Sequence, residues 1–410
     1  MRIIILNQTF HPDVAATAQL MWDLAQHLAC GGHEVHAVTS RSVYGSQERF
    51  EQAYECVGRI HIHRVAQTAF GKRHLPGRLC DFGSYYLTAW AKLQELPAAD
   101  VILALTSPPM VALLGMFQKQ FRARIDQGKV RLVYHVMDLY PEAAVAMGVL
   151  GARSPVTWGL RQLTRRTLEL ADDIIALGED MKELIVANYG LRRRADRIHV
   201  VHPWADGGAL GPLPRQQNPL AAKLGLGETF NIVYSGNLGM AHDVETLIGA
   251  IERMKEDSGT RFLFIGGGKR FEQLKRKAEQ SDWPTVRFLP YQEREALQQS
   301  LNLADVHLIS QLPAFTGVVV PSKLFGIMAV GKPAVMVGPA EAEVSRLISR
   351  HEAGAVVPNG LVGELVATLR QLREDGAMRK RLGRNAREAF GRLYDRSVAC
   401  ARIEQVLVGK

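Results

Sequence analysis

The chain has 410 residues, of which 47% are hydrophobic and 22% are charged. At roughly 100–200 residues per domain, this length predicts two or three domains with sizeable cores. No uninterrupted apolar run reaches the about 18 residues that a membrane-spanning helix needs, which excludes a polytopic membrane enzyme. Lys and Arg outnumber Asp and Glu by 50 to 41, and the net charge of +9 suits a phosphate-bearing substrate, a nucleic acid or an anionic membrane surface.

The cysteines and the N-terminus bear on cofactors and location. Cys30, Cys56, Cys80 and Cys400 lie far apart without C-x-x-C spacing, so neither a zinc site nor a disulfide scaffold is predicted. The start MRIIILNQTF leads directly into strand-like sequence and lacks the features of a secretory signal. We therefore expect a cytoplasmic protein.

The first half alternates short Val, Ile and Leu runs with amphipathic segments of helix length, which is the pattern of parallel strands joined by crossover helices. Each expected strand ends in turn or polar residues; the loop 7–18, for example, separates the first strand from a helix that starts near Gln19. The strands are predicted at 2–6, 35–39, 60–65, 101–105, 131–136 and 173–177.

Periodicity lapses at residues 207–228, where Gly, Pro and Gln occur without an apolar face, and this predicts a domain linker. A second alternating set follows. Its clearest helix spans 243–254, with one apolar stripe and with Asp243 where an N-cap acceptor would stand. The segment 378–408 is strongly charged and helix-permissive. The strands of this half are predicted at 230–235, 261–265, 286–289, 305–310 and 333–337.

These patterns predict an α/β protein with two Rossmann-like, doubly wound domains that face a cleft. We place the first domain at 1–203 and the second at 204–384, and we expect a C-terminal helix at about 385–410 to pack back on the first. No motif repeats at a fixed period, so the two halves are alike in architecture only.

Two glycine-containing loops in the second half are candidate anion sites. Residues 235–239 (SGNLG) follow a strand and precede the 243–254 helix, where backbone N–H groups and a helix N-terminus favour an anion. Residues 265–269 (IGGGK) follow the next strand, and Lys269 could pair with a phosphate. Each loop could also be an ordinary strand–helix turn without a ligand. Their occurrence in one half favours a nucleotide diphosphate.

A third candidate is the segment 320–333, VPSKLFGIMAVGKP. Pro321 would pre-set φ at a helix start, Ser322 and Lys323 would project from the first turn, and Gly331 fits the C′ position. Lys323 could reach a phosphate from this place, although a lone lysine is usually a solvated surface residue.

In the first half, Asp138 lies just beyond the strand at 131–136, at the edge where ligands bind in open α/β sheets. A helix N-cap is the alternative role for this residue. His135 lies within the apolar strand and is predicted to be a satisfied core histidine. The loops 8–13 and 106–109 also follow strands and could line the same cleft.

Residues 111–166 have a surplus of six positive charges, interleaved with apolar residues at Leu113, Leu114, Met116, Phe117, Phe121, Trp158, Leu160 and Leu163. This pattern indicates basic amphipathic helices able to contact an anionic membrane, with a solvated helix face as the alternative. No nucleic-acid-binding motif accompanies the charge, so we expect no nucleic-acid partner. The charged residues are Lys119, Arg122, Arg124, Lys129, Arg131, Arg153, Arg161, Arg165 and Arg166, with Asp126, Asp138 and Glu142.

Several motifs occur in order and at fitting distances along the chain. They are QTFHPDVAATAQL near the start, TSPP at 106–109, HVMDLYPE at 135–142, HPWAD at 202–206, YSGNLGMAHD at 234–243 and VPSKLFGIMAVGKP at 320–333. On these motifs the chain resembles the bacterial family-4 glycosyltransferases with the GT-B fold, in the branch of capsule, O-antigen and colanic-acid-type assembly enzymes. The resemblance covers nearly the whole chain.

The resemblance implies retaining transfer of a sugar from a nucleotide-diphosphate donor, without a metal ion or other cofactor. The second domain would hold the donor and the first the acceptor. Lys323 would contact the phosphates, Asp138 would lie beside the reacting sugar carbon, and Tyr291 would lie by the base. Protein groups would then stabilise the leaving diphosphate electrostatically. The donor-binding residues would be Gly236, Asn237, Leu238, Gly239, Gly267, Gly268, Lys269, Tyr291, Pro321 and Ser322.

The chain departs from the family at one pair of positions. The wider family carries two glutamates before and within the helix that precedes Ala-x-Gly-x-Pro; here one position is Gly326 and the other falls in 316–320, which contains no acid. The family also commonly has Arg and Lys where this chain has Asn237 and His242. Glu343 is the nearest acid that could take over a ribose or sugar contact, and it joins Asp138 and Lys323 as an expected catalytic residue.

The expectation for the whole chain is a cytoplasmic, membrane-peripheral hexosyltransferase of cell-surface polysaccharide biosynthesis, with a UDP donor favoured and a polyprenyl-linked or other glycan acceptor. Two alternatives stay open. One is a nucleotide-sugar 2-epimerase of the same architecture. The other is a catalytically silent nucleotide-sugar binding subunit, which the absent glutamate pair favours.

Overall fold

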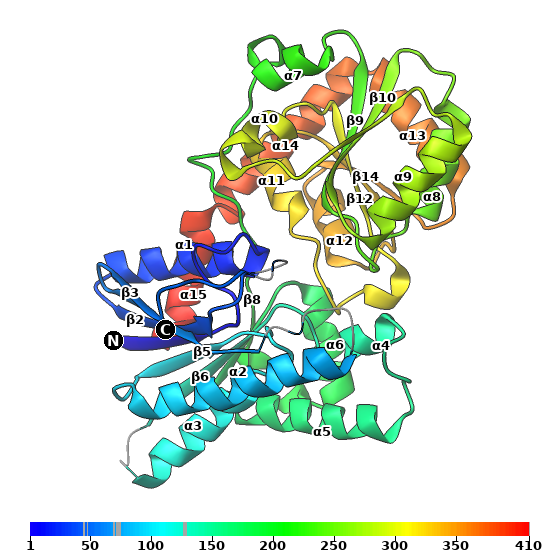
Figure 1. Cartoon of the computed structure of the whole chain (residues 1–410). Helices are drawn as coiled ribbons and strands as arrows, with labels where there is room; N and C mark the ends of the chain where they lie inside the picture. The colour runs from blue at the N-terminus through cyan, green and yellow to red at the C-terminus, as the bar shows by residue number, and fades with distance from the viewer. Residues whose placement is uncertain (44–45, 47, 69, 71–74, 126–128, 410) are drawn as a thin grey trace. The chain divides into compact units, whose positions relative to one another are not determined.

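The computed structural model describes residues 1–43, 46, 48–68, 70, 75–125 and 129–409. The chain divides into two compact units, of which the first comprises Met1–His202 with Ala399–Lys410 and the second Pro203–Val398. Each unit contains one extended sheet, and Figure 1 shows helices on both faces of each sheet. Residues 385–398, which were expected on the first domain, belong to the second unit.

The first unit is built on an eight-stranded sheet with the order β3-β4-β2-β1-β5-β6-β7-β8. All its pairings are parallel except the β3–β4 hairpin at one edge. The strands are β1 (Arg2–Leu6), β2 (Glu34–Ser40), β3 (Tyr54–Val57), β4 (Ile60–Val65), β5 (Val101–Ala104), β6 (Arg131–Val136), β7 (Asp173–Ala176) and β8 (Ile198–Val200). The sequence missed β3 and β8, which are short edge strands.

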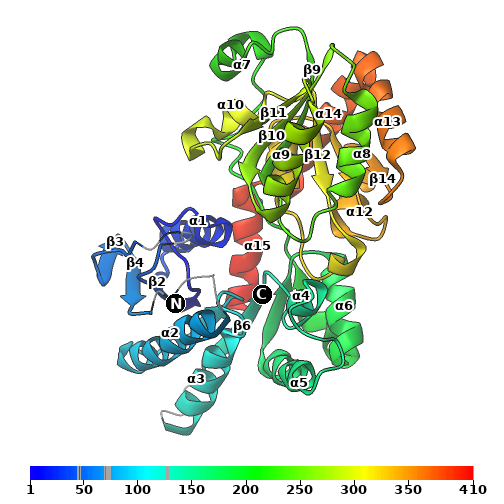
Figure 2. The ribbon, with the colours of Figure 1, turned by 45° about the vertical axis from the view of Figure 1, so that its right-hand side comes forward.

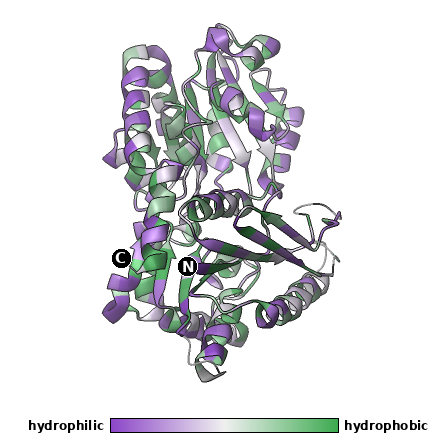
Figure 3. Cartoon of the chain, turned by 90° about the vertical axis from the view of Figure 1, so that its left-hand side faces the viewer, coloured by the Kyte–Doolittle hydropathy of each residue, from purple (hydrophilic) through white to green (hydrophobic). Residues whose placement is uncertain are grey.

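The helices of the first unit cover both faces of this sheet (Figure 2). In Figure 3 the long helices change between purple and green along their length, as expected of helices with one apolar face. The helices are α1 (Ala16–Cys30), α2 (Leu75–Glu95), α3 (Ala112–Ile125), α4 (Glu142–Ala146), α5 (Pro155–Leu170), α6 (Glu179–Tyr189) and the short η1 (Arg192–Arg197).

The last helix, α15 (Arg396–Val408), returns to the first unit (Figure 1). The Glu404 carboxylate accepts hydrogen bonds from the ring nitrogens of His27 (2.9 Å) and His33 (3.0 Å). Arg131 Nη1 donates to the Leu407 carbonyl at 2.7 Å. These contacts join the C-terminus of the chain to its first 131 residues. No helix among the described residues is long and apolar enough to cross a membrane.

The second unit is built on a six-stranded, all-parallel sheet with the order β11-β10-β9-β12-β13-β14. The strands are β9 (Phe230–Asn237), β10 (Thr260–Gly267), β11 (Val286–Leu289), β12 (Val306–Ser310), β13 (Ala334–Val337) and β14 (Gly354–Val357). The sequence missed β14, whose four residues begin with a glycine. A Cβ at Gly354 would meet the Ala334 carbonyl oxygen at 1.7 Å, so only glycine allows this strand to pair with β13.

The helices of the second unit form two layers, one with α8 and α13 and the other with α11 and α14 (Figures 1 and 2). Buried aromatic residues, including Tyr234, Phe264 and Phe271, join the sheet to the first of these layers. The helices are α7 (Pro219–Leu224), α8 (Glu245–Met254), α9 (Lys269–Ser281), α10 (Leu297–Leu301), α11 (Lys323–Ala329), α12 (Glu343–Arg350), α13 (Val362–Glu374) and α14 (Gly376–Leu393), with short η2 (Arg215–Gln217), η3 (Arg294–Ala296) and η4 (Pro313–Phe315).

The predicted linker 207–228 is an ordered part of the second unit. The Asn218 side chain accepts hydrogen bonds from the first turn of α7 and donates to the Gln299 carbonyl at 2.8 Å. The prediction of the Asp243 cap is confirmed: its carboxylate accepts from the backbone N–H of Thr246 at 3.1 Å. Gly331 has φ of +66° just after α11, as predicted for a C′ residue.

Candidate active site

The two glycine loops of the second unit lie side by side, because β9 and β10 are paired along their whole length to Gly236↔Gly266 and Asn237↔Gly267. The backbone N–H of Leu238 donates to the Gly267 carbonyl at 2.8 Å. The Leu238 carbonyl in turn accepts from the N–H of Arg270 at 3.0 Å. The loops therefore form one backbone surface at the carboxyl edge of the sheet.

Glycine is required at three positions of this surface. Gly236, Gly266 and Gly268 have φ of +114°, +135° and +123°, in the region that favours glycine. A Cβ at Gly268 would lie 2.4 Å from Asn237 Oδ1 and 2.6 Å from the Leu238 carbonyl oxygen. The absence of side chains lets the two loops approach each other and leaves backbone accessible, as a phosphate-binding loop requires.

Leu238 contributes to this surface only through its backbone, because its side chain is fully buried in the core of the unit. Asn237 is exposed and Gly239 is half-buried. Of the predicted loop residues, Asn237 and the glycines are therefore the ones placed to meet a ligand.

Lys323 is the first residue of α11, and its side chain reaches the end of β9. Its Nζ donates to the Tyr234 hydroxyl, lies 3.4 Å from the Asn237 carbonyl oxygen and stands 4.0 Å from the centre of the Tyr234 ring. Within the described part of the chain this lysine has no carboxylate partner. Burial lowers the pKa of Lys323 to about 7.

Tyr234 and His242 complete the surroundings of this lysine. His242 Nδ1 donates to the Ser310 carbonyl at 2.5 Å, and its ring lies edge-on to that of Tyr234. Burial and the charge of Lys323 lower the pKa of His242 to about 3, so its ring is neutral. Sequence reasoning assigned no role to Tyr234 or His242, although both lie in the YSGNLGMAHD motif.

Three further predicted donor residues lie at the same edge. The Tyr291 ring lies against Gly267, where a Cβ would be 3.1 Å from its Cε2 atom. Lys269 begins α9 and is exposed. Ser322 precedes α11 and is exposed, whereas Pro321 is half-buried and stands just before it.

Glu343 begins α12 after β13, which is separated from β9 by β12. Its side chain is only 1% exposed. Glu343 therefore shares the carboxyl edge of the sheet with Lys323, but the structure gives no contact between the two.

Asp138 lies in the first unit, after β6. Its backbone N–H donates to Thr106 Oγ1 at 3.2 Å, which ties it to the TSPP loop. The backbone N–H of Gln8 donates to the Ser107 carbonyl at 2.6 Å, so the loops after β1, β5 and β6 meet at one edge. Burial raises the pKa of Asp138 to about 6. The alternative role as a helix N-cap does not hold, because α4 begins at Glu142 after Pro141.

Two neighbouring residues of the HVMDLYPE motif are structural. His135 is buried, as predicted, and burial lowers its pKa to about 4. Its ring nitrogens have no hydrogen-bond partner among the described residues, so the expectation of a satisfied histidine is not met. Glu142 is buried and accepts hydrogen bonds from Arg161 at 2.8 and 3.0 Å and from the Tyr189 hydroxyl at 3.1 Å.

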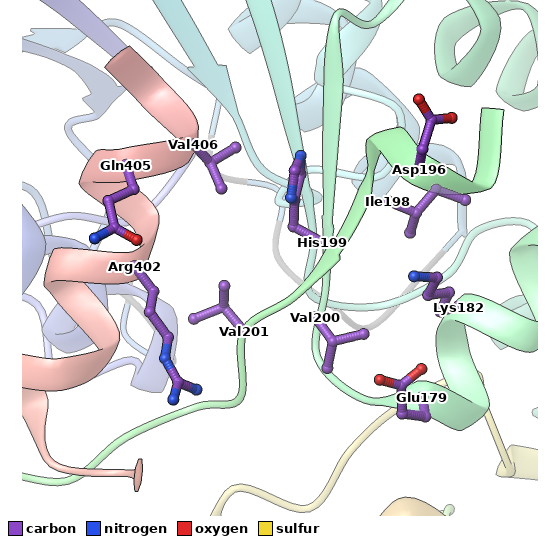
Figure 4. Close-up of a pocket in the computed structure, with 10 residues that line it drawn as sticks. All are labelled: Glu179, Lys182, Asp196, Ile198, His199, Val200, Val201, Arg402, Gln405 and Val406. Atoms are coloured by element: carbon purple, nitrogen blue, oxygen red, sulfur yellow. The ribbon is translucent and has the colours of Figure 1, made fainter. Parts of the chain in front are cut away.

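A pocket of about 410 Å³ lies elsewhere in the first unit, between β8, α6 and α15 (Figure 4). Lys182, Glu179 and Arg402 are among its lining residues. None of the predicted site residues lines it. Among the described residues, the one group spaced for a metal ion is on β2 and β4 of the first unit.

A lysine beside two interlocked glycine loops can bind a diphosphate and stabilise it as a leaving group. The chain contains two α/β units built on largely parallel sheets, and the second unit has the glycine loops and Lys323 that can bind an anion. This arrangement defines a protein of the GT-B fold. Comparison with known proteins agrees with that class. The family model described as "Glycosyltransferase Family 4" matches residues 17–206, and the model "Glycosyl transferases group 1" matches residues 217–389. The chain belongs to the family-4 glycosyltransferases and is a glycosyltransferase enzyme.

Curated relatives agree with this membership. The chain is 25% identical to WcaI of Escherichia coli (strain K12), named for glycosyl transfer in colanic acid biosynthesis, over 90% of this chain and 92% of that protein. It is 29% identical to the glycosyltransferase WbjE of Pseudomonas aeruginosa, over 62% of this chain and 61% of the relative.

Solved structures share the fold. Sucrose-phosphate synthase from Thermosynechococcus elongatus is 16% identical with a TM-score of 0.77, over 100% of this chain and 98% of that one. HepE of Anabaena in complex with UDP-glucose is 16% identical with a TM-score of 0.72, over 100% of both chains.

Proposed function

We propose that this glycosyltransferase moves a sugar, with retention of configuration, from a UDP-type donor to a lipid-linked or other glycan acceptor in cell-surface polysaccharide biosynthesis. The observation that carries the proposal is the position of Lys323 beside the glycine loops at the end of β9. The name of WcaI, with its colanic acid role, and the UDP-glucose bound to HepE support the acceptor class and the donor class.

The proposed reaction proceeds on one face of the sugar. The bond between the anomeric carbon and the diphosphate oxygen breaks, and that oxygen takes the proton of the acceptor hydroxyl as the new glycosidic bond forms on the same face. Lys323 and the loop at 236–239 stabilise the negative charge that the departing diphosphate gains. Asp138 orients or polarises the sugars. We propose that these groups serve without a metal ion.

Glu343 has a smaller role in this proposal, as a sugar or ribose contact in place of the family's glutamate pair. Its buried position at the start of α12 is compatible with holding a hydroxyl group. If Glu343→Gln leaves the KM for the donor unchanged, this assignment is wrong.

The experiment is a thermal-shift panel with UDP-, GDP-, ADP- and dTDP-sugars, with and without EDTA. A ligand that binds only the folded protein raises the Tm by mass action, by an amount set by its concentration relative to Kd. We expect a shift with UDP-sugars that EDTA does not change and that Lys323→Ala strongly reduces at the same ligand concentration. No shift with any nucleotide would remove the donor site from the proposal.

Transfer assays separate the alternatives. A 2-epimerase would release UDP and an epimerised sugar without an acceptor, and a silent binding subunit would show a thermal shift without turnover. We expect neither of these results. Instead, UDP should be released only when an acceptor is present. The pairing of Lys323 with the glycine loops favours the donor chemistry common to all three, and the family membership favours transfer.

We also propose that the enzyme is peripheral on an anionic membrane in the cytoplasm. The neighbouring helices α3 and α5 expose Phe117, Phe121, Trp158 and Leu163 by 41 to 67%. Helix α5 also exposes Arg165 and Arg166, which lie 2.9 and 3.9 Å from the carboxylate of Glu169. Exposed apolar and basic side chains on one helix are typical of membrane-surface binding.

Part of the predicted basic surface is committed to the fold. Lys119, Arg131 and Arg161 pair with Asp172, Asp173 and Glu142. Leu114 and Met116, two of the predicted apolar contacts, are buried in the unit. The side chain of Arg124 and residue Asp126 lie outside the described part. The proposed contact is therefore concentrated on α5 and the exposed rings of α3.

A further inference from the structure

A cluster of polar side chains lies on one face of β2 and β4, at the amino ends of these parallel strands. The register pairs His36 with His61 and Val38 with His63, and Glu34 precedes His36 by two residues, so Glu34, His36, His61 and His63 point to the same face. The family resemblance assigns nothing to these residues. The loops of the first unit that contain Gln8, Ser107 and Asp138 follow the carboxyl ends of their strands, at the opposite edge.

Three ligand atoms converge in this cluster. Glu34 Oε1 lies 3.0 Å from His36 Nε2 and 3.9 Å from His61 Nε2. One ligand atom from each of the three residues lies within 4.8 Å of the others. In a tetrahedral zinc site with bonds of about 2.0–2.1 Å, ligand atoms are separated by about 3.3 Å. The cluster therefore needs shifts of about 1.5 Å or less to coordinate an ion.

Each of these residues has its other polar atom held by a neighbour. His36 Nδ1 is hydrogen-bonded to His63 Nε2 at 3.1 Å. His61 Nδ1 accepts from the Tyr54 hydroxyl at 2.8 Å or donates to it. The second oxygen of Glu34 accepts from Arg2 Nη2 at 3.1 Å. Outer partners of this kind orient the ligands of metal sites.

We propose that Glu34, His36 and His61 bind a divalent transition-metal ion of the zinc type. Two imidazoles and one carboxylate suit such an ion and leave a fourth position for water. The planes of the His36 and His61 rings are stacked with an angle of 13° between them. Both rings can coordinate one ion only if one of them turns. His61 can do so, because its side chain is 25% exposed, whereas that of His36 is only 7% exposed.

The position of the site indicates a structural role. The ion would join β2 to β4, and Tyr54 would add the edge strand β3 to the same unit. This proposal does not depend on the proposed transfer reaction, since the nucleotide-induced thermal shift and zinc binding are measured separately. The spacing of these residues in the sequence gave no signal for such a site. Although β2 and β4 are paired in the sheet, the chain between His36 and His61 includes the strand β3.

The experiment titrates EDTA-treated, untagged full-length protein with ZnCl₂ in a calorimeter and in a thermal-shift assay. We expect one Zn²⁺ per chain and a higher Tm. His61→Gln and Glu34→Gln should each weaken Zn²⁺ binding at least about tenfold. Tyr54→Phe, which keeps the ring of a half-exposed residue, should weaken it about 10–100-fold as loss of an outer partner does.

His199→Gln is the matched control, because His199 pairs with Asp173 elsewhere in the first unit. It should bind Zn²⁺ as the wild type does. Co²⁺ in place of Zn²⁺ should give the visible absorption of a tetrahedral N/O site, and His61→Gln should lose it. No stoichiometric uptake by the wild type, or uptake unchanged in both His61→Gln and Glu34→Gln, would overturn the proposal.

Discussion

Lys323 differs from an ordinary surface lysine because its ammonium group is held against uncharged partners. The Tyr234 hydroxyl and the Asn237 carbonyl accept hydrogen bonds from it, and burial lowers its pKa to about 7. A diphosphate would supply the missing negative charge and raise that pKa again. Binding of the donor is therefore coupled to the protonation of this residue.

The first prediction concerns the pH dependence of UDP binding. Below pH 7 the free enzyme carries protonated Lys323; above pH 7 the lysine must take up a proton when UDP binds, so affinity should fall by up to about tenfold per pH unit. Calorimetry in buffers of different ionisation enthalpy should detect proton uptake at pH 8. Lys323→Arg, which stays charged, should flatten the profile, and Lys323→Ala should weaken binding about 10–100-fold at pH 6.5. A wild-type affinity that is constant from pH 7 to pH 9 would contradict the prediction.

The second prediction concerns Asp138. Burial raises the pKa of its carboxyl group to about 6. The folded protein holds this proton more tightly than the unfolded chain, so the residue costs stability as pH rises through about 4 to 6, and the full cost applies above pH 6. Asp138→Asn should therefore have a Tm at pH 7.5 equal to or above that of the wild type, with the difference vanishing near pH 4. Its transfer rate should fall at least about a hundredfold. A lower Tm at pH 7.5 with retained activity would show that Asp138 is structural.

At the scale of elements, the donor surface depends on how β9 and β10 end. Each strand runs into a loop whose glycine has positive φ. The backbone N–H of Leu238 donates to the Gly267 carbonyl, and the Leu238 carbonyl accepts from the N–H of Arg270. A side chain at Gly266 or Gly268 would push the two loops apart, because the Cβ atom would clash with the neighbouring loop. The site is therefore a property of two paired strands rather than of one motif.

The third prediction tests this pairing. Gly268→Ala should raise the KM for the donor at least about tenfold and lower the Tm, because its Cβ would lie 2.4 Å from Asn237 Oδ1 and its φ is +123°. Gly227→Ala is the control: a Cβ there meets nothing within 4 Å and φ is not positive. Steady-state kinetics and thermal unfolding of both variants provide the measurement. Equal donor KM values in the two variants would disprove the proposed role of the loop.

At the scale of the whole molecule, the fourth prediction concerns the membrane. The double variant Trp158→Ser with Leu163→Ser removes two exposed apolar side chains of α5 and should reduce sedimentation with phosphatidylglycerol vesicles several-fold. Binding should also weaken as salt is raised, because part of the attraction is electrostatic. Leu87→Ser on α2 is the control, because Leu87 is 75% exposed and lies outside residues 111–166. If the α5 double variant binds vesicles as well as the Leu87→Ser control does, α5 is not the membrane contact.

The residues that sequence patterns placed well are those with a local signal. The strands follow from the spacing of hydrophobic residues, the Asp243 cap from capping preferences, and the C′ glycine Gly331 from the backbone conformation that glycine allows. Each of these signals acts over a few residues. The motifs also placed Asp138, Lys323 and the glycine loops at the carboxyl ends of strands. Short edge strands such as β8 and β14 escaped because three or four residues carry too little pattern.

The sequence by itself determined the α/β class, the two-unit organisation in outline and the family, because these depend on periodicity and on motifs that are contiguous in the chain. Only the tertiary structure decided that Lys323 rests on Tyr234, that Leu238 faces the core and that Glu34, His36 and His61 converge. It also decided that Lys119, Arg131 and Arg161 are committed to ion pairs. The physical reason is that strand register and helix packing bring together residues tens to hundreds of positions apart, and no local pattern records those distances.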